Sequence, residues 1–73
     1  MKVVTMKNNV REMREARNLT QKELGEKVGV SRQAINAVET GKFDPSIWLA
    51  NDLAKYFSVS IEILFIFREE DRK

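Results

Sequence analysis

The sequence predicts a small all-α fold of five short helices. Three observations support this prediction: apolar residues recur at helical spacing, Ser, Thr or Asn precedes each such stretch, and Gly or Pro marks several connections. A chain of 73 residues suffices for one domain with a small core. We therefore expect one domain over residues 1–73, with residues 1–6 as a leader or short strand and residues 66–73 as a strand and tail.

The first helix is expected over Lys7–Arg17, with Asn8 or Asn9 as its cap. Its apolar positions lie along one side: Val10, Met13 and Ala16 or Arg17. Arg14 lies next to that side, where a charged group needs a partner. The alternative is a solvated surface arginine.

The second helix begins after Thr20. Thr20 and Glu23 have the spacing of a capping box, in which the hydroxyl accepts a backbone N–H and the glutamate reaches back to the Thr20 amide. Leu24 and Val28, four residues apart, give this helix one apolar stripe. Gly25 lies beside the stripe, where a small residue lets another helix backbone come close. We therefore expect the second helix to pack tightly against its neighbour.

A tight turn joins the second helix to a third. Gly29 follows the last apolar position, where a left-handed conformation ends a helix and costs glycine no strain. Ser31 then caps the third helix, which Gly41 ends. The buried positions of the third helix are expected to be Ala34, Ile35 and Val38. Its open face then carries Arg32, Gln33 and Asn36.

Two helices crossing through such a turn form a helix-turn-helix, whose second helix can enter the major groove of DNA. Arginine pairs bidentately with guanine, and glutamine and asparagine pair with adenine, so Arg32, Gln33 and Asn36 can read base edges. The alternative is an ordinary helical hairpin with a solvated polar face. The joint pattern of capping box, small residue, turn glycine and second cap favours DNA binding.

A fourth helix is expected to form the centre of the core. The loop before it contains the single proline of the chain, Pro45, and we expect Phe43 to pack under this loop. Ser46 caps the helix, which continues to about Phe57. Apolar residues follow at helical spacing: Ile47, Leu49, Ala50, Leu53, Ala54 and Phe57. Trp48 falls off this stripe and is expected to be half exposed.

The C-terminal part carries more apolar side chains than one small core can cover. Ser60 caps a last helix, from Ile61 to about Phe65, and five consecutive apolar residues run from position 63 to position 67. In a helix, the side away from the core would carry Ile63, Ile66 and Phe67. Because an exposed patch of this kind usually marks an interface, we expect a homodimer joined through these three residues. The alternative is that the run folds back on its own core and dimers form only on DNA.

Short strands are the expected addition to the helices. A helix to about Phe65 followed by a strand at Ile66–Arg68 fits the apolar run best, and Val3–Thr5 is the candidate to pair with it. These strands are expected at the dimer interface, and an exchange of strands between subunits is compatible with the pattern.

Composition excludes several classes of function. Cysteine and histidine are absent, which removes disulfides, thiolate metal sites, and the commonest general base. We expect no cofactor, no metal and no enzymatic activity. No signal peptide or long apolar span is present, so a cytoplasmic protein without membrane contact is expected. Residues 1–42 hold nine Lys or Arg against five acids, whereas residues 43–73 hold four against six. The basic excess thus lies in the half with the proposed recognition helix.

The stretch TQKELGEKVGVSRQAINAVETGKFDPS resembles the Cro/repressor (XRE-like) helix-turn-helix family, and the resemblance runs from about Lys7 to Phe65. It implies a lambda-repressor-like domain of five helices that usually binds short operators as a dimer. It also implies that Arg14 pairs with Glu39. Two positions depart from the family pattern. Gly25 replaces a commoner alanine, which keeps the packing at a cost of about 1 kcal/mol in helix propensity, and Ile63 replaces a polar residue.

The function expected from these features is a sequence-specific, DNA-binding transcriptional regulator of the repressor type, acting as a homodimer on double-stranded DNA. The helix that starts at Ser31 would read the major groove, with Ala37 touching a thymine methyl group. Gln21, Lys42 and the amide end of the second helix would hold phosphates. The alternatives are an antitoxin or restriction–modification controller whose C-terminal part binds a partner protein, and an interaction module without DNA binding.

Overall fold

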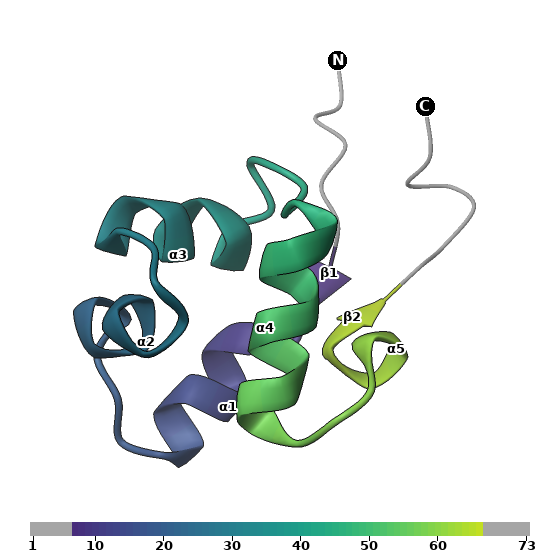
Figure 1. Cartoon of the computed structure of the whole chain (residues 1–73), viewed down its shortest axis with the longest axis horizontal. Coiled ribbons are helices and arrows are strands. Elements are labelled where there is room, and N and C mark those ends of the chain that lie inside the picture. Colours follow the sequence, from purple (N-terminus) through teal and green to yellow (C-terminus); the bar gives the residue numbers. More distant parts are fainter. Residues whose placement is uncertain (1–6, 67–73) are drawn as a thin grey trace.

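The computed structural model describes residues 7–66, which form five helices and one small antiparallel sheet (Figure 1). The elements follow in the order β1 (Lys7–Asn8), α1 (Val10–Ala16), α2 (Gln21–Val28), α3 (Arg32–Glu39), α4 (Ile47–Phe57), α5 (Ile61–Leu64) and β2 (Phe65–Ile66). The expected all-α fold of five helices is confirmed for this part of the chain, with the sheet as a minor addition.

Four of the helices begin at the caps that the sequence predicts. The hydroxyl groups of Thr20, Ser31, Ser46 and Ser60 each accept a hydrogen bond from the backbone N–H three residues on. Thr20 also completes the capping box, since its own N–H donates to Glu23 Oε1 at 2.8 Å. These local bonds satisfy backbone donors that a helix start otherwise leaves unpaired.

The first helix is shorter than expected. It begins at Val10, not Lys7, because Lys7–Asn8 is extended and pairs with Phe65–Ile66, with Lys7 opposite Ile66. Asn9 occupies the cap position but makes no side-chain cap bond; the Val10 N–H donates to Asn8 Oδ1 at 3.1 Å. Within the described residues the sheet lies at 7–8 and 65–66, so the C-terminal strand begins one residue earlier than expected and Ile66 pairs with Lys7. Val3–Thr5 and residues 67–68, which the prediction used, lie outside the described residues.

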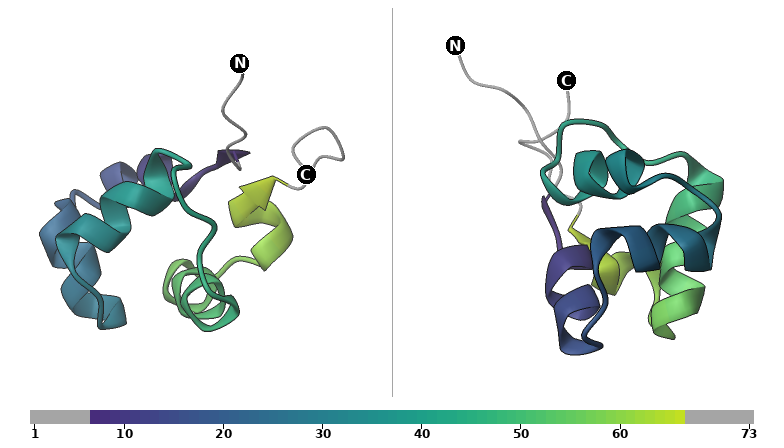
Figure 2. Two further views of the ribbon diagram at one scale, coloured as in Figure 1. Left: turned by 90° about the horizontal axis from the view of Figure 1, so that it is seen from above. Right: turned by 90° about the vertical axis from the view of Figure 1, so that its left-hand side faces the viewer.

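The core is one cluster to which all five helices contribute. Its most completely buried side chains are Val10, Leu24, Ile35, Leu53, Leu64 and Phe65. α3 lies along one end of the molecule, α2 lies between α3 and α1, and β1 leads from the sheet directly into α1, close to β2 and α5 (Figures 1 and 2). Arg17 joins the end of α1 to α4, because its guanidinium donates to the carbonyl oxygens of Tyr56 and Phe57 and lies over both rings.

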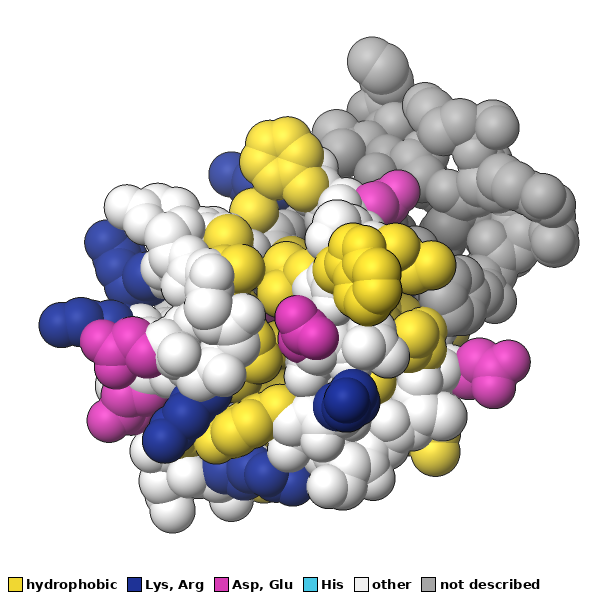
Figure 3. Space-filling model, viewed as in Figure 1, with side chains coloured by type: hydrophobic (Ala, Val, Ile, Leu, Met, Phe, Trp, Pro, Cys, Tyr) yellow, Lys and Arg dark blue, Asp and Glu magenta, His cyan; other side chains and the backbone are white. Residues whose placement is uncertain are grey.

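Two apolar side chains that were expected to pack inward are exposed. Phe43 is 68% exposed in the loop after α3, and Ile47 is 77% exposed in the first turn of α4. The packed part of α4 begins with the partly buried Leu49 and the buried Ala50, so the start of the helix extends past the core. Trp48 is 75% exposed, more than the half exposure expected. Figure 3 shows hydrophobic side chains projecting from this region.

Candidate nucleic-acid interface

α3 has one anchored face and one open face. Ile35 and Val38 are buried in the core, whereas Arg32, Gln33 and Asn36 are exposed. Ala34, which was expected to be buried, is only partly so, as is Ala37. Ser31 is exposed at the start of the helix and caps it through the Ala34 N–H at 3.1 Å. The three predicted base-reading side chains thus lie together on one accessible surface.

The angle between α2 and α3 is fixed by backbone contacts in the turn. Gly29 adopts the expected left-handed conformation, with φ of 79°. The Val30 N–H donates to the Gly25 carbonyl oxygen at 2.9 Å, and a Cβ added at Gly25 would lie only 2.5 Å from the Val30 carbonyl oxygen. The close approach expected beside Gly25 is therefore made by the turn itself. Glycine is favoured here for space, because the Cβ of an alanine would lie too close to that backbone oxygen.

An ion pair joins α1 to α3. Arg14 Nε donates to Glu39 Oε2 at 2.6 Å, and Nη2 donates to Glu39 Oε1 at 3.3 Å. The two side chains are only 11% and 3% exposed, and Arg14 Nη1 also donates to the Leu19 carbonyl oxygen at 2.7 Å. The hydrogen bond to Glu39 raises the pKa of the Arg14 guanidinium, against the opposing effect of burial. The pair that the resemblance implies is thus present, and it holds the end of α3 against α1.

Gln21 lies at the start of α2, where a phosphate contact was expected. Its Nε2 donates to Glu39 Oε1 at 3.1 Å and to Asn36 Oδ1 at 3.2 Å. The side chain therefore bridges α2 to two residues of α3. Nothing in the sequence pattern indicated this bridge, because it depends on how the two helices cross.

Lys42 follows α3 closely in the chain. Its backbone N–H donates to the Ala37 carbonyl oxygen at 3.0 Å and so closes the end of the helix. Its side chain is exposed and, within residues 7–66, makes no hydrogen bond or ion pair. An ammonium group in this place is free to meet a phosphate oxygen.

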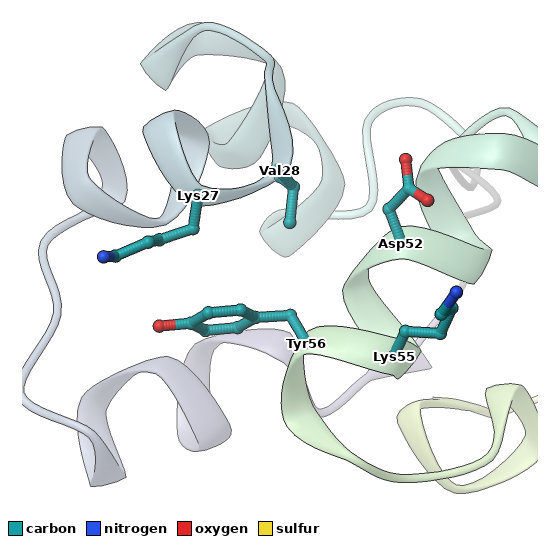
Figure 4. A pocket seen from close by; sticks show the side chains of 5 residues that line it. All are labelled: Lys27, Val28, Asp52, Lys55 and Tyr56. Carbon is teal, nitrogen blue, oxygen red and sulfur yellow. The ribbon is translucent and has the colours of Figure 1, made fainter.

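An open hollow of about 380 Å³ lies between α2 and α4, lined by Lys27, Val28, Asp52, Lys55 and Tyr56 (Figure 4). None of these residues belongs to the predicted interface. Within the described range, no three carboxylate, imidazole or thiol groups gather as metal ligands would. No helix of residues 7–66 combines the length and apolar character needed to cross a membrane.

Ile63 and Ile66, two of the three predicted dimer residues, are 55% and 37% exposed. Their neighbours Leu64 and Phe65 are buried, with 0% and 1% exposed. The apolar run is therefore divided between the core and the surface. Its helical part ends with α5 at Leu64, and the chain is extended from Phe65. Phe67 lies outside the described residues.

Comparison with known proteins identifies relatives of both the sequence and the fold. The profile of the helix-turn-helix family matches residues 10–64. An uncharacterised HTH-type transcriptional regulator of Methanocaldococcus jannaschii is 50% identical over 66 residues, which are 90% of this chain and 100% of that protein. The P22 c2 repressor, solved in complex with a synthetic operator, has a TM-score of 0.71 and 30% identity, covering 74% of this chain and 82% of the repressor chain. Bacillus thuringiensis PlcR, solved with the peptide PapR7 and DNA, has a TM-score of 0.68 and 26% identity, covering 88% of this chain and 24% of PlcR.

Proposed function

Because the chain belongs to the helix-turn-helix family of transcriptional regulators, we propose that it is a cytoplasmic regulator that recognises specific DNA sequences as a homodimer. One observation carries the proposal. Arg32, Gln33 and Asn36 share the open face of α3, while the opposite face is anchored in the core. A rigid helix with such side chains on its outer surface fits the major groove.

The contacts divide into those that read bases and those that hold the backbone. Arg32 and Gln33 lie in the first turn of α3, the part of a recognition helix that approaches base edges, with Ser31 beside them. Ala37 can contact a thymine methyl group through its partly exposed side chain. Lys42 and the amide groups at the start of α2 would bind phosphates and fix the register of the helix.

Selection from a pool of random double-stranded DNA tests the proposal directly. The bound sequences are expected to converge on one motif, and the affinity for that motif is expected to exceed the affinity for scrambled DNA of the same length by a factor of about 10³ or more. Both affinities should fall as salt rises, since phosphate contacts release counterions. Binding without any enriched motif would contradict sequence-specific regulation.

The homodimer is supported by the exposed apolar residues near the C-terminus. Burying Ile63 and Ile66 against a second copy would remove apolar surface from water, which is the usual driving force for association. Phe67 is the third residue assigned to this interface. A two-fold dimer would place two α3 helices roughly 34 Å apart, one turn of DNA, and would require a nearly palindromic operator.

The same exposed residues favour one second candidate function. An antitoxin or a restriction–modification controller would use its C-terminal part to bind a different protein. Purification of the tagged chain from its own cells distinguishes the two proposals. A small partner protein in fixed ratio would support the second, and a homodimer alone would support the first.

A further inference from the structure

Two adjacent asparagines, Asn8 and Asn9, connect the C-terminal elements to α3. The Asn9 N–H donates to the Leu64 carbonyl oxygen at 2.8 Å, and its side-chain Nδ2 donates to the Ile63 carbonyl oxygen at 2.9 Å. On the preceding residue, Asn8 Nδ2 donates to the carbonyl oxygen of Val38, in the last turn of α3, at 2.9 Å. Figure 2 shows β1 between the end of α3 and β2. One backbone step therefore separates the hydrogen bonds to α5 from the hydrogen bond to α3.

The carboxamide of Asn8 fits its two backbone partners in one orientation. Its Oδ1 accepts the Val10 N–H at 3.1 Å, a donor that the start of a helix leaves without an intrahelical partner. Its Nδ2 donates to the Val38 carbonyl oxygen. A flip would place the NH₂ group against an N–H and the amide oxygen against a carbonyl oxygen, and both bonds would be lost. Asn8 thus holds the start of α1 and the end of α3 at once.

The sheet makes β1 and the C-terminal elements one hydrogen-bonded unit. In the antiparallel pair, Lys7 lies opposite Ile66 and Asn8 lies opposite Phe65. Ile63 and Ile66, whose side chains are exposed, belong to this unit. Because Asn8 joins the unit to α3, its side chain connects the proposed dimer interface to the recognition helix.

We propose that Asn8 is a positioning residue that sets the spacing between the two half-sites of the operator. The inference rests on the proposed function, because it takes the dimer to form through Ile63 and Ile66 and α3 to enter the major groove. The distance between the two α3 helices then depends on how each α3 is held relative to its own α5 and β2. One added base pair moves a half-site by about 3.4 Å and turns it by roughly 35° about the DNA axis. A dimer with rigidly held helices cannot follow this displacement.

A looser connection has the opposite effect. Without the Asn8 bond, the angle of α3 is freer, while the Arg14–Glu39 pair and the buried Val38 keep the helix on the core. The helix can then adjust to a displaced half-site, but ordering it on the best-spaced operator costs conformational entropy. Loss of the bond should therefore flatten the preference for one spacing. Binding to a single half-site should not change, because it involves only one α3.

The first test uses the free wild-type protein and needs no DNA. Side-chain amide exchange measured by NMR should show an Asn8 NH₂ proton protected several-fold relative to those of Asn18. Asn18 is the matched control, because it is exposed and its side chain makes no hydrogen bond within residues 7–66. Equal exchange for the two asparagines would overturn the inference.

The second test measures binding to palindromes of the selected motif whose half-sites are moved apart or together by one base pair at a time. The wild type should bind one spacing about tenfold or more tightly than its neighbours, since a misplaced half-site forfeits the gain from bivalent binding. In Asn8→Ser this factor should fall below about threefold. The serine hydroxyl can still accept the Val10 N–H but is too short to reach α3. The affinity for an isolated half-site should equal that of the wild type.

Two further variants make the comparison specific. Asn8→Asp keeps the shape and the acceptor for the Val10 N–H but replaces the donor to Val38 by an oxygen, so it should flatten the spacing preference as well. Asn18→Gly removes an exposed carboxamide at a left-handed position, with φ of 58°, which glycine tolerates. This control should keep the spacing preference of the wild type.

The outcomes separate this inference from the proposed function. An unchanged spacing preference in folded Asn8→Ser would overturn the inference and leave the proposed function intact. Equal losses on half-sites and palindromes would also overturn it, because they would give Asn8 a structural role only. If the wild type selects no motif or gains nothing from a second half-site, the proposed function fails and the inference fails with it. Circular dichroism verifies folding, and Asn8→Asp decides the test if Asn8→Ser does not fold.

Discussion

Arg32 and Gln33 are exposed in the first turn of α3, and neither side chain has a partner within residues 7–66. Replacing either by alanine is expected to cost about 1–3 kcal/mol of binding free energy on the preferred operator and to relax the choice at one base pair. A base-edge contact forms only with the base that it recognises. Its loss therefore lowers the affinity for the operator but not the affinity for sequences that lack this base. Titration of operator and scrambled DNA by fluorescence anisotropy measures both effects.

Lys42→Ala is the matched control for these variants. Because a phosphate contact carries no sequence information, this change should weaken binding to all sequences alike and lower the slope of log K against log salt by about one. If Arg32→Ala and Gln33→Ala behaved in the same uniform way, their assignment to base reading would be wrong.

Glu23 makes the stability of α2 depend on pH. Hydrogen bonds with the Thr20 backbone N–H and the Thr20 hydroxyl lower the pKa of Glu23 below its ordinary value of 4.5. A group with a lowered folded-state pKa contributes stability above its unfolded pKa and loses that contribution as pH falls through the folded value. The wild type should therefore be more stable than Glu23→Gln at neutral pH, and the difference should shrink as the pH falls below 4.5.

Urea titrations of both proteins across this pH range measure the difference. The glutamine side chain of the variant can still accept the Thr20 N–H, so the comparison isolates the charge. A difference in unfolding free energy that is equally large at both ends of the range would contradict the role assigned to the carboxylate.

At the scale of elements, the contact between α1 and α3 depends on a buried charge. Arg14→Ala and Glu39→Ala should each lower the unfolding free energy by more than the ~1 kcal/mol typical of a surface pair, since each leaves a poorly hydrated partner behind. The double variant should lose much less than the sum. Denaturant titrations of the four proteins give the coupling energy.

The Arg11–Glu15 pair provides a control on the same helix. Its two side chains are 68% and 55% exposed, so Arg11→Ala should cost less than ~1 kcal/mol. Additive losses for Arg14→Ala and Glu39→Ala would show that the two residues do not interact in solution.

The elements that could be predicted from sequence are those with local signals. Thr20, Ser31, Ser46 and Ser60 mark helix starts by short-range hydrogen bonds, so α2 to α5 begin where expected. Strands of two residues show no periodicity, and their pairing joins segments far apart in the sequence, so no local signal indicated the strand at Lys7–Asn8. The open face of α3, in contrast, follows from its periodicity.

Contacts set by the crossing of helices could not be found in this way. The Gln21–Asn36 bridge joins residues 15 positions apart, and no spacing rule connects two helices of unknown angle. The exposure of Phe43 and Ile47 escaped prediction for a related reason. Periodicity shows which face of a helix is apolar, but not how far the neighbouring elements extend along it.

At the scale of the whole molecule, the apolar surface exceeds what one copy covers. Ile63 and Ile66 are exposed beside the buried Leu64 and Phe65, and they are expected to form a two-fold interface. The wild type should sediment as a dimer at tens of micromolar. The double variant Ile63→Asp, Ile66→Asp should sediment as a monomer, because a charge in the centre of an apolar interface is left without a partner.

Ile47→Asp separates this interface from the other exposed apolar region. Ile47 is 77% exposed at the start of α4, so an aspartate there should leave the dimer intact if the C-terminal residues form it. A dimer that survives the double variant but is lost in Ile47→Asp would move the interface to the start of α4. Binding to DNA gives a second test of the C-terminal interface. If this interface sets the spacing of the two α3 helices, the double variant Ile63→Asp, Ile66→Asp should bind an isolated half-site as tightly as the wild type does. It should then lose the added affinity that the wild type gains from a palindrome with half-sites roughly 34 Å apart.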